Sequence, residues 1–303
     1  MPDRPLANVS RSQILIAFAA VYVIWGSTYL AIRFAIETLP SALMLGTRFL
    51  GAGGIMYIWL RARGAKAPRA IHWRSAAILG ILMPVFGTGI VVWAEKRVPS
   101  GTAALLVAIE PLWIVLLQWV HPNGKRPSAA VIAGVALGLA GLYLLVDPGG
   151  TKAHGNFFAE GVLLLAALSW AIGSLYSRSA PRAEAKFLGT AMEMLVAGAV
   201  LITLGLAGGE AGHFSFAAAS GKSWMALLYL ITFGSIIAYT AYVWLLRTVS
   251  PTLVSTYAFV NPVVAVLLGW AFAGEPLNAR TIAAAAVIVG AVALITIGGT
   301  EEK

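Results

Sequence analysis

Residues 81–120 read ILMPVFGTGIVVWAEKRVPSGTAALLVAIEPLWIVLLQWV, and this stretch decides the fold because the chain repeats it. Residues 232–271 read TFGSIIAYTAYVWLLRTVSPTLVSTYAFVNPVVAVLLGWA, and the two stretches align at a constant offset of 151 residues without a gap. The alignment pairs Glu110-Pro111 with Asn261-Pro262. Self-similarity at a fixed spacing indicates that the chain contains two copies of one unit.

The similarity continues outward from this stretch. WGSTY at 25–29 matches IGSLY at 172–176, and RFLGAGG at 48–54 matches EMLVAGA at 193–199. Each pair alone is weak, but four segments that match in the same order carry more weight. We therefore predict two halves, residues 1–150 and residues 151–303.

Composition indicates the solvent in which these halves fold. The chain has 303 residues, 59% hydrophobic and 11% charged, and its mean hydropathy is +0.85. No soluble domain needs this much apolar surface. The apolar residues fall in runs of about twenty, which span roughly 30 Å of hydrocarbon. The sequence predicts an all-α membrane protein with ten transmembrane helices, over residues 13–34, 40–60, 74–94, 98–120, 128–146, 157–177, 187–207, 223–245, 251–272 and 279–298.

Five spans in each half are an odd number, so the second half must lie upside down relative to the first, as a 5+5 inverted-topology repeat. Lysine and arginine set the orientation, because cytoplasmic loops carry an excess of both. With the N-terminus inside, fourteen of the 21 basic residues fall on inner segments and six on outer ones. Both termini are predicted to be cytoplasmic, with basic loop residues in contact with anionic membrane lipid.

Several functional classes lack the residues that they need. The chain has no cysteine, which excludes thiol catalysis and thiolate metal sites. All four histidines fall in loops or at span ends, so no metal site is expected. No phosphate-binding loop of the GxxxxGKS type occurs, and no basic domain stands outside the spans. Nucleotide hydrolysis, nucleic-acid binding and a bound cofactor are therefore not predicted.

The segments WGSTY, FGSIIAY and YAFVNPVVAVLLG, with the 5+5 repeat, resemble the drug/metabolite transporter superfamily and, within it, EamA-type permeases of bacterial inner membranes. The resemblance covers roughly residues 13–298. Characterised members of this family export amino acids and related metabolites, and others move sugars or cationic drugs. The resemblance implies a central cavity lined by spans one, three, four, six, eight and nine. In this family a Gly-Glu pair often follows the fourth and the ninth spans. Here Gly274-Glu275 follows the ninth span, but residues 121–126, after the fourth, read HPNGKR and contain no such pair.

Glu110 is predicted to lie near the bilayer centre, where a charged side chain costs several kcal/mol of free energy. Burial there favours the neutral acid. Pro111 and Pro262 lack an N–H, so a carbonyl four residues earlier loses its helical partner. One interpretation is a site at Glu110 and Asn261 that binds substrate, titrates a proton or binds an amine, with the two prolines in gating. The other is a kink whose polar neighbours satisfy the freed backbone groups.

Arg48 and Glu193 occupy matching positions in the two halves, each well inside its span. They can act as charges near the gates, or one of them can contact substrate. Alternatively, Arg48 snorkels to the outer surface and Glu193 caps a neighbouring loop. A direct ion pair between them is not expected, because their depths differ.

Aromatic residues gather in the spans that the resemblance assigns to the cavity. Helical spacing places Trp113 on the face of Glu110 and Tyr257 on the face of Asn261. An aromatic wall with one acid and one amide suits a small amphipathic solute with an amino group. The predicted aromatic lining is Trp25, Tyr29, Trp93, Trp113, Trp170, Tyr176, Tyr239, Tyr242 and Tyr257.

The leading hypothesis is a secondary active exporter of amino acids or related metabolites that works by alternating access, with protons as the candidate coupling ion. A drug, sugar or nucleotide-sugar carrier of the same fold is the alternative within transport, and it would depend on Arg48 rather than on Glu110. From other classes, a passive channel and a membrane-embedded lipid-modifying enzyme are alternatives, but no clustered acid and base for the enzyme is visible. Glycines on the fifth and tenth spans predict close packing within the bundle, and the chain is expected to be a monomer or a weak homodimer.

Overall fold

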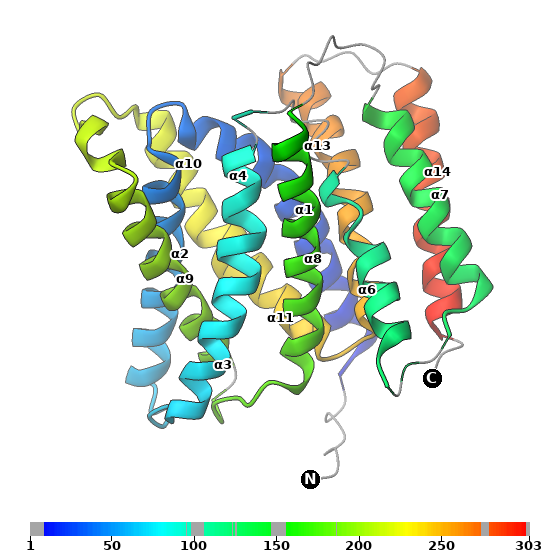
Figure 1. The fold of residues 1–303 in the computed structure, drawn as a ribbon, viewed down its shortest axis with the longest axis horizontal. Coiled ribbons are helices and arrows are strands. Elements are labelled where there is room, and N and C mark those ends of the chain that lie inside the picture. Colours follow the sequence, from blue (N-terminus) through cyan, green and yellow to red (C-terminus); the bar gives the residue numbers. More distant parts are fainter. Residues whose placement is uncertain are drawn as a thin grey trace.

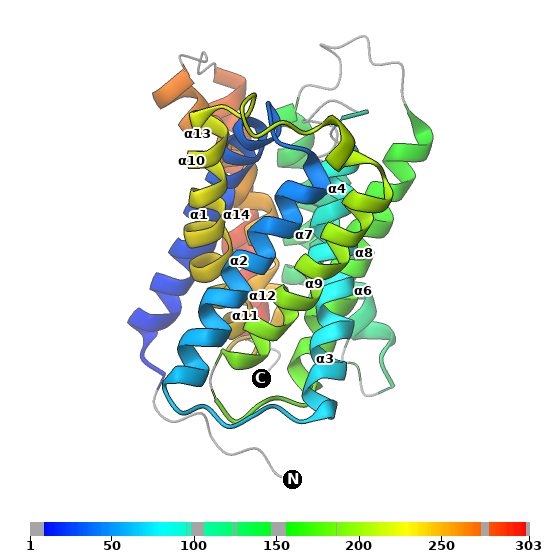
Figure 2. The ribbon, with the colours of Figure 1, turned by 90° about the vertical axis from the view of Figure 1, so that its left-hand side faces the viewer.

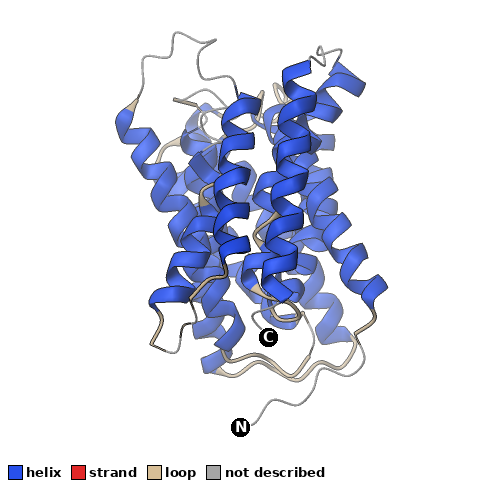
Figure 3. Cartoon of the chain, turned by 90° about the vertical axis from the view of Figure 1, so that its right-hand side faces the viewer, coloured by secondary structure: helices blue, strands red, loops and turns tan. Residues whose placement is uncertain are grey.

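The computed structural model describes residues 9–94, 96–97, 106–122, 124, 126–146, 156–185, 187–273 and 279–300, and within these residues it contains helices and no strand (Figure 3). In the first half the helices are α1 (Arg11–Ile36), α2 (Ser41–Ala62), α3 (Ala70–Gly80), η1 (Ile81–Gly89), α4 (Ile90–Ala94), α6 (Glu110–Val120) and α7 (Ala129–Val146). In the second half they are α8 (Phe157–Ser179), α9 (Leu188–Ala207), η2 (Glu210–His213), α10 (Gly221–Tyr229), η3 (Leu230–Tyr239), α11 (Thr240–Leu246), α12 (Pro251–Val254), α13 (Tyr257–Ala273) and α14 (Ala279–Thr300).

The chain is an all-helical membrane protein by the length and apolar character of its helices. Among the described residues, seven continuous helical segments are long and apolar enough to cross a bilayer, and Glu110–Val120 and Ala129–Leu144 are shorter apolar helices. Helix covers most of the described part of every predicted span. Residues 98–105 of the predicted fourth span lie outside the described residues, as does the Gly274-Glu275 pair.

Two of the long helices contain π-helical segments at matching places. η1 joins α3 to α4, and η3 joins α10 to α11. The offset of 151 residues maps 81–89 onto 232–240, so the two segments nearly coincide in the repeat. Pro84 lies in η1, but η3 contains no proline, so a missing N–H alone does not explain the π geometry. Wider helical turns of this kind are frequent at functional sites.

The two prolines of the repeated motif occupy different helical positions. α6 begins at Glu110, so Pro111 lies in the first turn, where its missing N–H would have no intrahelical partner. Pro262 lies inside α13 instead. In this half the helix is interrupted at Ser255–Thr256, between α12 and α13. Pro262 thus leaves the Ala258 carbonyl without its helical donor but does not end the helix.

Close helix pairs form two sides of the bundle. α2 packs along α9, and α7 packs along α14, as Figures 1 and 2 show. A Cβ atom added at Gly134 would lie 2.6 Å from Ile295 Cγ1, and one added at Gly141 would lie 2.7 Å from Ile288 Cγ1. These glycines therefore permit the close approach of α7 and α14 that the small residues predicted. The start of α1 and the end of α14 lie at the same end of the bundle (Figure 1).

Candidate functional site

A cavity of about 120 Å³ lies in the middle of the bundle. It is bounded by α1, α2, η1, α4, α8, η3 and α13, together with Val107 and Glu110 next to the start of α6. Eight of the residues predicted from sequence line it, namely Trp25, Tyr29, Arg48, Glu110, Trp170, Tyr239, Tyr257 and Asn261.

Glu110 is almost completely buried, with 1% of its surface exposed, and it lines this cavity. Neither carboxyl oxygen has a hydrogen-bond partner among the described residues. The side chains of Tyr242 and Tyr257 lie near the carboxyl group but outside hydrogen-bonding geometry. The position of Glu110 in the first turn of α6 favours an acid, because the start of a helix carries partial positive charge. Both carboxyl oxygens are thus buried and have no partner in this part of the chain.

Asn261 is also buried, but its amide group is engaged by the backbone. The surrounding acceptors fix the amide orientation, with the nitrogen donating to the Tyr22 carbonyl at 3.1 Å and the Tyr257 carbonyl at 3.2 Å. Tyr22 lies on α1, so this contact joins the first half to the second. The acceptors do not include the Ala258 carbonyl, the group that Pro262 deprives of a helical donor. Asn261 therefore serves as an interhelical link at the cavity wall.

Arg48 does not snorkel to the surface, because only 5% of the residue is exposed. Its Nε donates to Ser235 Oγ at 2.8 Å, and its guanidinium carbon lies 5.0 Å from the centre of the Phe49 ring. A Cβ atom added at Gly234 would lie 3.0 Å from Arg48 Nη2, so glycine leaves room for the guanidinium group there. The cation is thereby held in the cavity wall.

Four aromatic residues, Trp25, Trp170, Tyr242 and Tyr257, form a cluster that we call the aromatic floor. Ring centres of neighbouring members lie 4.9–5.7 Å apart, in tilted or edge-to-face arrangements. Such pairs contribute beyond their buried area. An added Cβ at Gly87 would collide with the Trp170 ring, so this glycine permits the ring to seat against η1.

Hydrogen bonds fix the floor in place. Trp170 Nε1 donates to the Tyr242 hydroxyl at 2.8 Å, and that hydroxyl also pairs with Ser174 Oγ at 2.7 Å. Trp25 Nε1 donates to the Gly234 carbonyl at 3.0 Å. The polar atoms of these large rings are thus satisfied without exposure to lipid. Hydrogen bonds thus hold the rings on this side of the cavity.

Glu193 lies behind the cavity wall rather than on it. It is 2% exposed, and the Tyr239 hydroxyl donates to its Oε2 at 3.1 Å. Tyr239 itself lines the cavity, so it separates Glu193 from the space inside. Arg48 and Glu193 do not form an ion pair, as their different depths predicted. They instead contact Ser235 and Tyr239, two residues of η3 that are four positions apart.

Four residues of the predicted aromatic lining do not border the cavity: Tyr242 packs within the aromatic floor, and Trp93, Trp113 and Tyr176 lie elsewhere. Trp93 is 36% exposed, with the Arg97 guanidinium 3.8 Å from its ring centre and Phe158 against its edge. Trp113 lies on α6 beyond Glu110, and the cavity does not extend that far along the helix. Tyr176 lies past Trp170 on α8, where the helix no longer borders the cavity. Membership of a span that borders the cavity therefore did not ensure that a residue lines it. Pro111 and Pro262 are buried beside the cavity rather than in its lining.

Several polar residues of the site were not selected from the sequence. Ser235 holds Arg48, and the Tyr22 carbonyl accepts from Asn261. Thr28 and Thr88 lie in the cavity wall. Thr28 and Ser235 had a signal, since they belong to the WGSTY and FGSIIAY segments that carry the family resemblance. A backbone carbonyl such as that of Tyr22 has no sequence signature.

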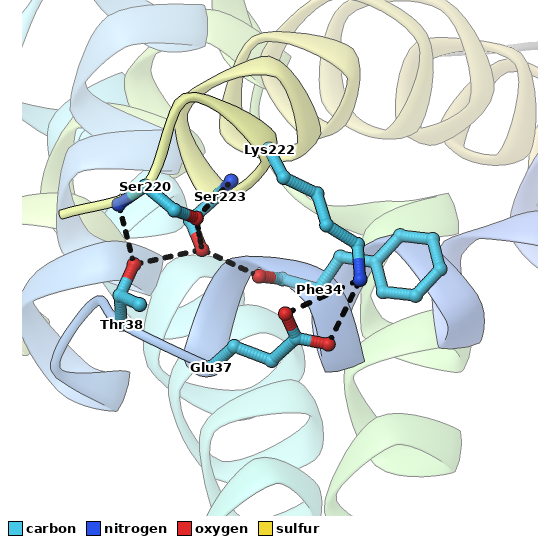
Figure 4. Close-up of polar contacts among 6 residues, drawn as sticks. All are labelled: Phe34, Glu37, Thr38, Ser220, Lys222 and Ser223. Atoms are coloured by element: carbon cyan, nitrogen blue, oxygen red, sulfur yellow. Dashed lines mark hydrogen bonds and ion pairs between the residues drawn. The ribbon is translucent and has the colours of Figure 1, made fainter.

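At the end of α1 beyond the cavity, a polar network joins the two halves (Figure 4). Lys222 Nζ lies 3.0 Å from Glu37 Oε1 and 3.6 Å from the centre of the Phe34 ring. Thr38 Oγ1 donates to Ser223 Oγ at 2.8 Å, and Ser223 Oγ donates to the Phe34 carbonyl at 2.7 Å. The contacts tie the end of α1 to the start of α10.

At the opposite end, a pair of exposed residues joins two loops. Lys66 Nζ lies 2.9 Å from Glu184 Oε2. The hydrogen bond and charge of Lys66 lower the pKa of the Glu184 carboxyl. Within the part of the chain that the structure describes, no three His, Cys, Asp or Glu residues gather to hold a metal ion.

Apolar helices around a central cavity of aromatic and polar residues are typical of membrane proteins that carry small molecules. The family comparison gives the same class. The model of the EamA-like transporter family matches residues 12–147 and matches again over residues 157–297. The chain therefore belongs to the EamA-like transporter family of the drug/metabolite transporter superfamily, and it is a transporter-family protein rather than an enzyme.

Two relatives bear on function. The uncharacterized inner membrane transporter YedA of Escherichia coli (strain K12) is 41% identical over 283 residues, which cover 93% of this chain and 90% of YedA. A probable terminal-alkyne amino-acid exporter of Streptantibioticus cattleyicolor is 31% identical over 156 residues, which cover 52% of this chain and 51% of that protein. A solved crystal structure matches with a TM-score of 0.78 and 23% identity over 96% of this chain and 100% of that one, a likeness of fold.

Proposed function

We propose that the protein is a secondary active transporter of the inner membrane that exports small metabolites, most of all amino acids or related amphipathic compounds. The observation that carries this proposal is the central cavity, in which an aromatic floor meets Glu110, Asn261 and Arg48. Aromatic faces accept apolar groups and cations, while the acid and the guanidinium group accept charged ends of a solute. The names of the two relatives, an inner membrane transporter and an amino-acid exporter, are in keeping with it.

The proposed topology has ten spans in two halves, residues 1–150 and 151–303, with the second inverted relative to the first. The π-helical segments at matching positions support it, because an unrelated second half would have no reason to repeat η1 in η3. An even number of crossings agrees with the start of α1 and the end of α14 at one end of the bundle. The excess of basic residues on the inner segments supports a cytoplasmic position for both termini.

In the proposed mechanism the two halves rock around the cavity, which faces each side of the membrane in turn. The aromatic floor is one barrier, and it is built from Trp25 of the first half and three residues of the second. The network at Glu37 and Lys222 also joins the halves, at the other end of α1. Inward opening would separate the members of the floor. Pro111 and Pro262 would let α6 and α13 change direction during this motion.

Arg48 supports a second candidate, a carrier of anionic sugars such as nucleotide sugars. The cation lines the cavity, where it can bind phosphate. Such a carrier would depend on Arg48 and tolerate the loss of the Glu110 carboxyl. The unpartnered oxygens of Glu110 favour the amine-bearing substrates instead.

The test has two stages. Purified protein is screened by thermal unfolding against amino acids, sugars, polyols, nucleotide sugars and cationic drugs, because a bound ligand stabilises the native state. Compounds that raise the Tm are then followed as radiolabelled solutes in proteoliposomes, with counterflow from preloaded vesicles. Amino-acid counterflow supports the exporter, whereas counterflow of nucleotide sugars alone would establish the second candidate. Flux without countertransport would indicate a channel.

Proton coupling has its own test. Glu110→Gln removes the group that can exchange a proton while it keeps the size of the side chain. We expect the variant to fold and to lose the dependence of transport on an imposed pH gradient. Transport with an unchanged response to the gradient would reject Glu110 as the coupling site.

A further inference from the structure

The first helix of each half packs mostly on helices of the other half. α1 lies against α10, η3, α11 and α13, whereas α8 lies against η1, α4 and α6. We call these two groups the α1 bundle and the α8 bundle. The cavity lies between them, with Trp25, Tyr239 and Asn261 from the α1 bundle and Gly87 and Trp170 from the α8 bundle.

On the side of the termini, the two bundles meet along a seam between α8 and α11. Within the aromatic floor, Tyr242 on α11 pairs with Trp170 and Ser174 on α8. Ser177 and Arg178 follow one turn later on α8, on the same face as Ser174, because side chains three or four positions apart share a helix face. α8 and α11 both end on this side (Figure 1).

Two arginines join the helix ends of this seam reciprocally. Arg178 Nη1 on α8 donates to the Leu246 carbonyl at 2.9 Å and to the Val249 carbonyl at 2.8 Å. Arg247, directly after α11, donates from Nε to the Ser177 carbonyl at 3.3 Å. The last carbonyls of a helix have no partner within it and carry partial negative charge, so a cation from the neighbouring helix suits each end.

The polar contacts at the two ends of the protein differ in what they join. Near the termini, Thr252 Oγ1 on α12 also donates to Gln118 Oε1 on α6 at 3.0 Å, so this contact links the same two sides as the arginines do. At the opposite end, the network of Lys222, Glu37 and Ser223 joins α1 to α10, within the α1 bundle (Figure 4). That network holds the exchanged helix on its own bundle.

We propose that the ends of α8 and α11 form the gate of the cavity on the side of the termini, and that Arg178 and Arg247 hold it closed. This inference rests on the proposed alternating access and refines it, because the bodies that rock are halves that have exchanged their first helices. Opening separates each arginine from the opposite helix end and then parts Trp170 and Ser174 from Tyr242. Neither arginine is buried, so water replaces the hydrogen bonds that they lose.

The experiment uses a chain that has no cysteine of its own. Ser174→Cys places a single thiol in the seam, where the serine has no exposed surface. Full-length protein in detergent is treated with a water-soluble maleimide, and the labelling rate is measured with and without Arg178→Gln and Arg247→Gln together. We expect the two arginine substitutions to raise the rate at least tenfold, because the open seam admits the reagent. Arg178→Lys keeps the charge and should raise the rate less than Arg178→Gln does.

Two controls separate opening of the gate from other effects. Arg182→Gln is the matched charge control, because Arg182 lies at the same end but donates to the Arg178 carbonyl rather than to the end of α11. It should leave the labelling rate unchanged. Ala52→Cys reports unfolding, because Ala52 is fully buried on α2. A thiol there should stay unreactive as long as the arginine variants are folded.

A second measurement applies where the arginine variants do not fold. Spin labels on Ser179→Cys and Thr248→Cys report the distance between the ends of α8 and α11 while both arginines remain in place. We expect two populations of distance, one closed and one open. A single population in lipid vesicles would overturn the gate.

The outcomes distinguish this gate from the proposed function. If the thiol of Ser174→Cys stays unreactive in folded protein without the two arginines, the gate is rejected, whatever solute the protein transports. An equal rise in the rate with Arg182→Gln would assign the effect to net charge and would also reject it. Labelling requires no substrate, so failure of every tested solute to show counterflow would reject the exporter without changing the result for the gate.

Discussion

Glu110 and Asn261 stand at the same place in the two copies of the repeat, yet their surroundings are opposite. The amide of Asn261 donates to two backbone carbonyls, one on its own helix and one on α1. The carboxyl oxygens of Glu110 have no partner among the described residues. One copy thus uses its polar residue to join helices, and the other leaves the oxygens of its polar residue without a partner in the described part of the chain.

The chemistry of the two side chains explains why they are not interchangeable. An amide nitrogen supplies two donors, which match two carbonyl oxygens, whereas a carboxylate supplies none. Glu110 occupies the first turn of α6, where an acid is favourable, but Asn261 lies within the continuous helix α13. The choice of acid or amide therefore follows from where each helix begins.

The largest effect on stability is expected when the amide of Asn261 is replaced by an acid, the group that Glu110 carries. Asn261→Asp keeps the shape of the side chain but directs carboxyl oxygens at the carbonyls of Tyr22 and Tyr257. Even a protonated aspartic acid can donate only one hydrogen bond. We expect a loss of about 2–4 kcal/mol in the free energy of unfolding, from the lost bonds and the buried acid. Unfolding of ligand-free protein in detergent measures it, and a Tm equal to that of the wild type would contradict the role of Asn261 as a link.

This contrast was only partly predictable from the sequence. The span ranges followed from runs of apolar residues, and the cost of a charge in apolar surroundings identified Glu110. The repeat identified Asn261 as its counterpart. The carbonyl of Tyr22 could not be recognised, because every residue has a carbonyl and only the packing of α1 against α13 brings this one within reach.

The aromatic residues show the same limit. Trp25 and Trp93 had equal standing in the sequence, but one lies in the aromatic floor and the other is exposed beside Arg97. Their separation depends on how the helices are rotated about their axes, which apolar patterning inside a membrane leaves undetermined. The π geometry of η3 could not be predicted either, since this segment contains no proline that would indicate an irregular helix.

The second prediction concerns the reverse change, in which the carboxyl group of Glu110 is replaced by an amide like that of Asn261. Glu110→Gln should leave the Tm of ligand-free protein unchanged or higher, because it removes a buried group that can carry an uncompensated charge. Transport of the preferred amino acid should fall at least tenfold, which corresponds to about 1.4 kcal/mol. Uptake into proteoliposomes at equal protein content provides the measurement. A variant that unfolds easily yet transports normally would reverse the comparison between the two positions.

Tyr257 lies between the two positions and allows a finer test. Its carbonyl accepts from Asn261, while its ring belongs to the floor near Glu110. Tyr257→Phe keeps the carbonyl and the ring but removes the hydroxyl, so only the Glu110 side changes. If the hydroxyl binds the amino acid, its removal costs one hydrogen bond of roughly 0.5–1.5 kcal/mol. We therefore expect the affinity for the amino acid to fall about threefold to tenfold, with little change in Tm.

Trp93→Phe is the control for this variant, because Trp93 lies outside the cavity. It should bind the amino acid as the wild-type protein does. Equal affinities for wild type and Tyr257→Phe would show that the hydroxyl plays no part in binding, and the ring alone would then account for the presence of tyrosine.

The smallest effects concern the prolines that both copies share. Pro111→Ala should lower stability by about 0.4–1 kcal/mol, because proline suits the first turn of a helix and restricts the unfolded chain. Pro262→Ala should be neutral or stabilising, because alanine restores a donor for the Ala258 carbonyl inside α13. The opposite signs are measurable as Tm shifts in the same detergent. If Pro262→Ala raises the Tm but slows transport, the missing donor serves the motion of α13. Unchanged transport in both variants would mean that the prolines shape the helices without taking part in gating.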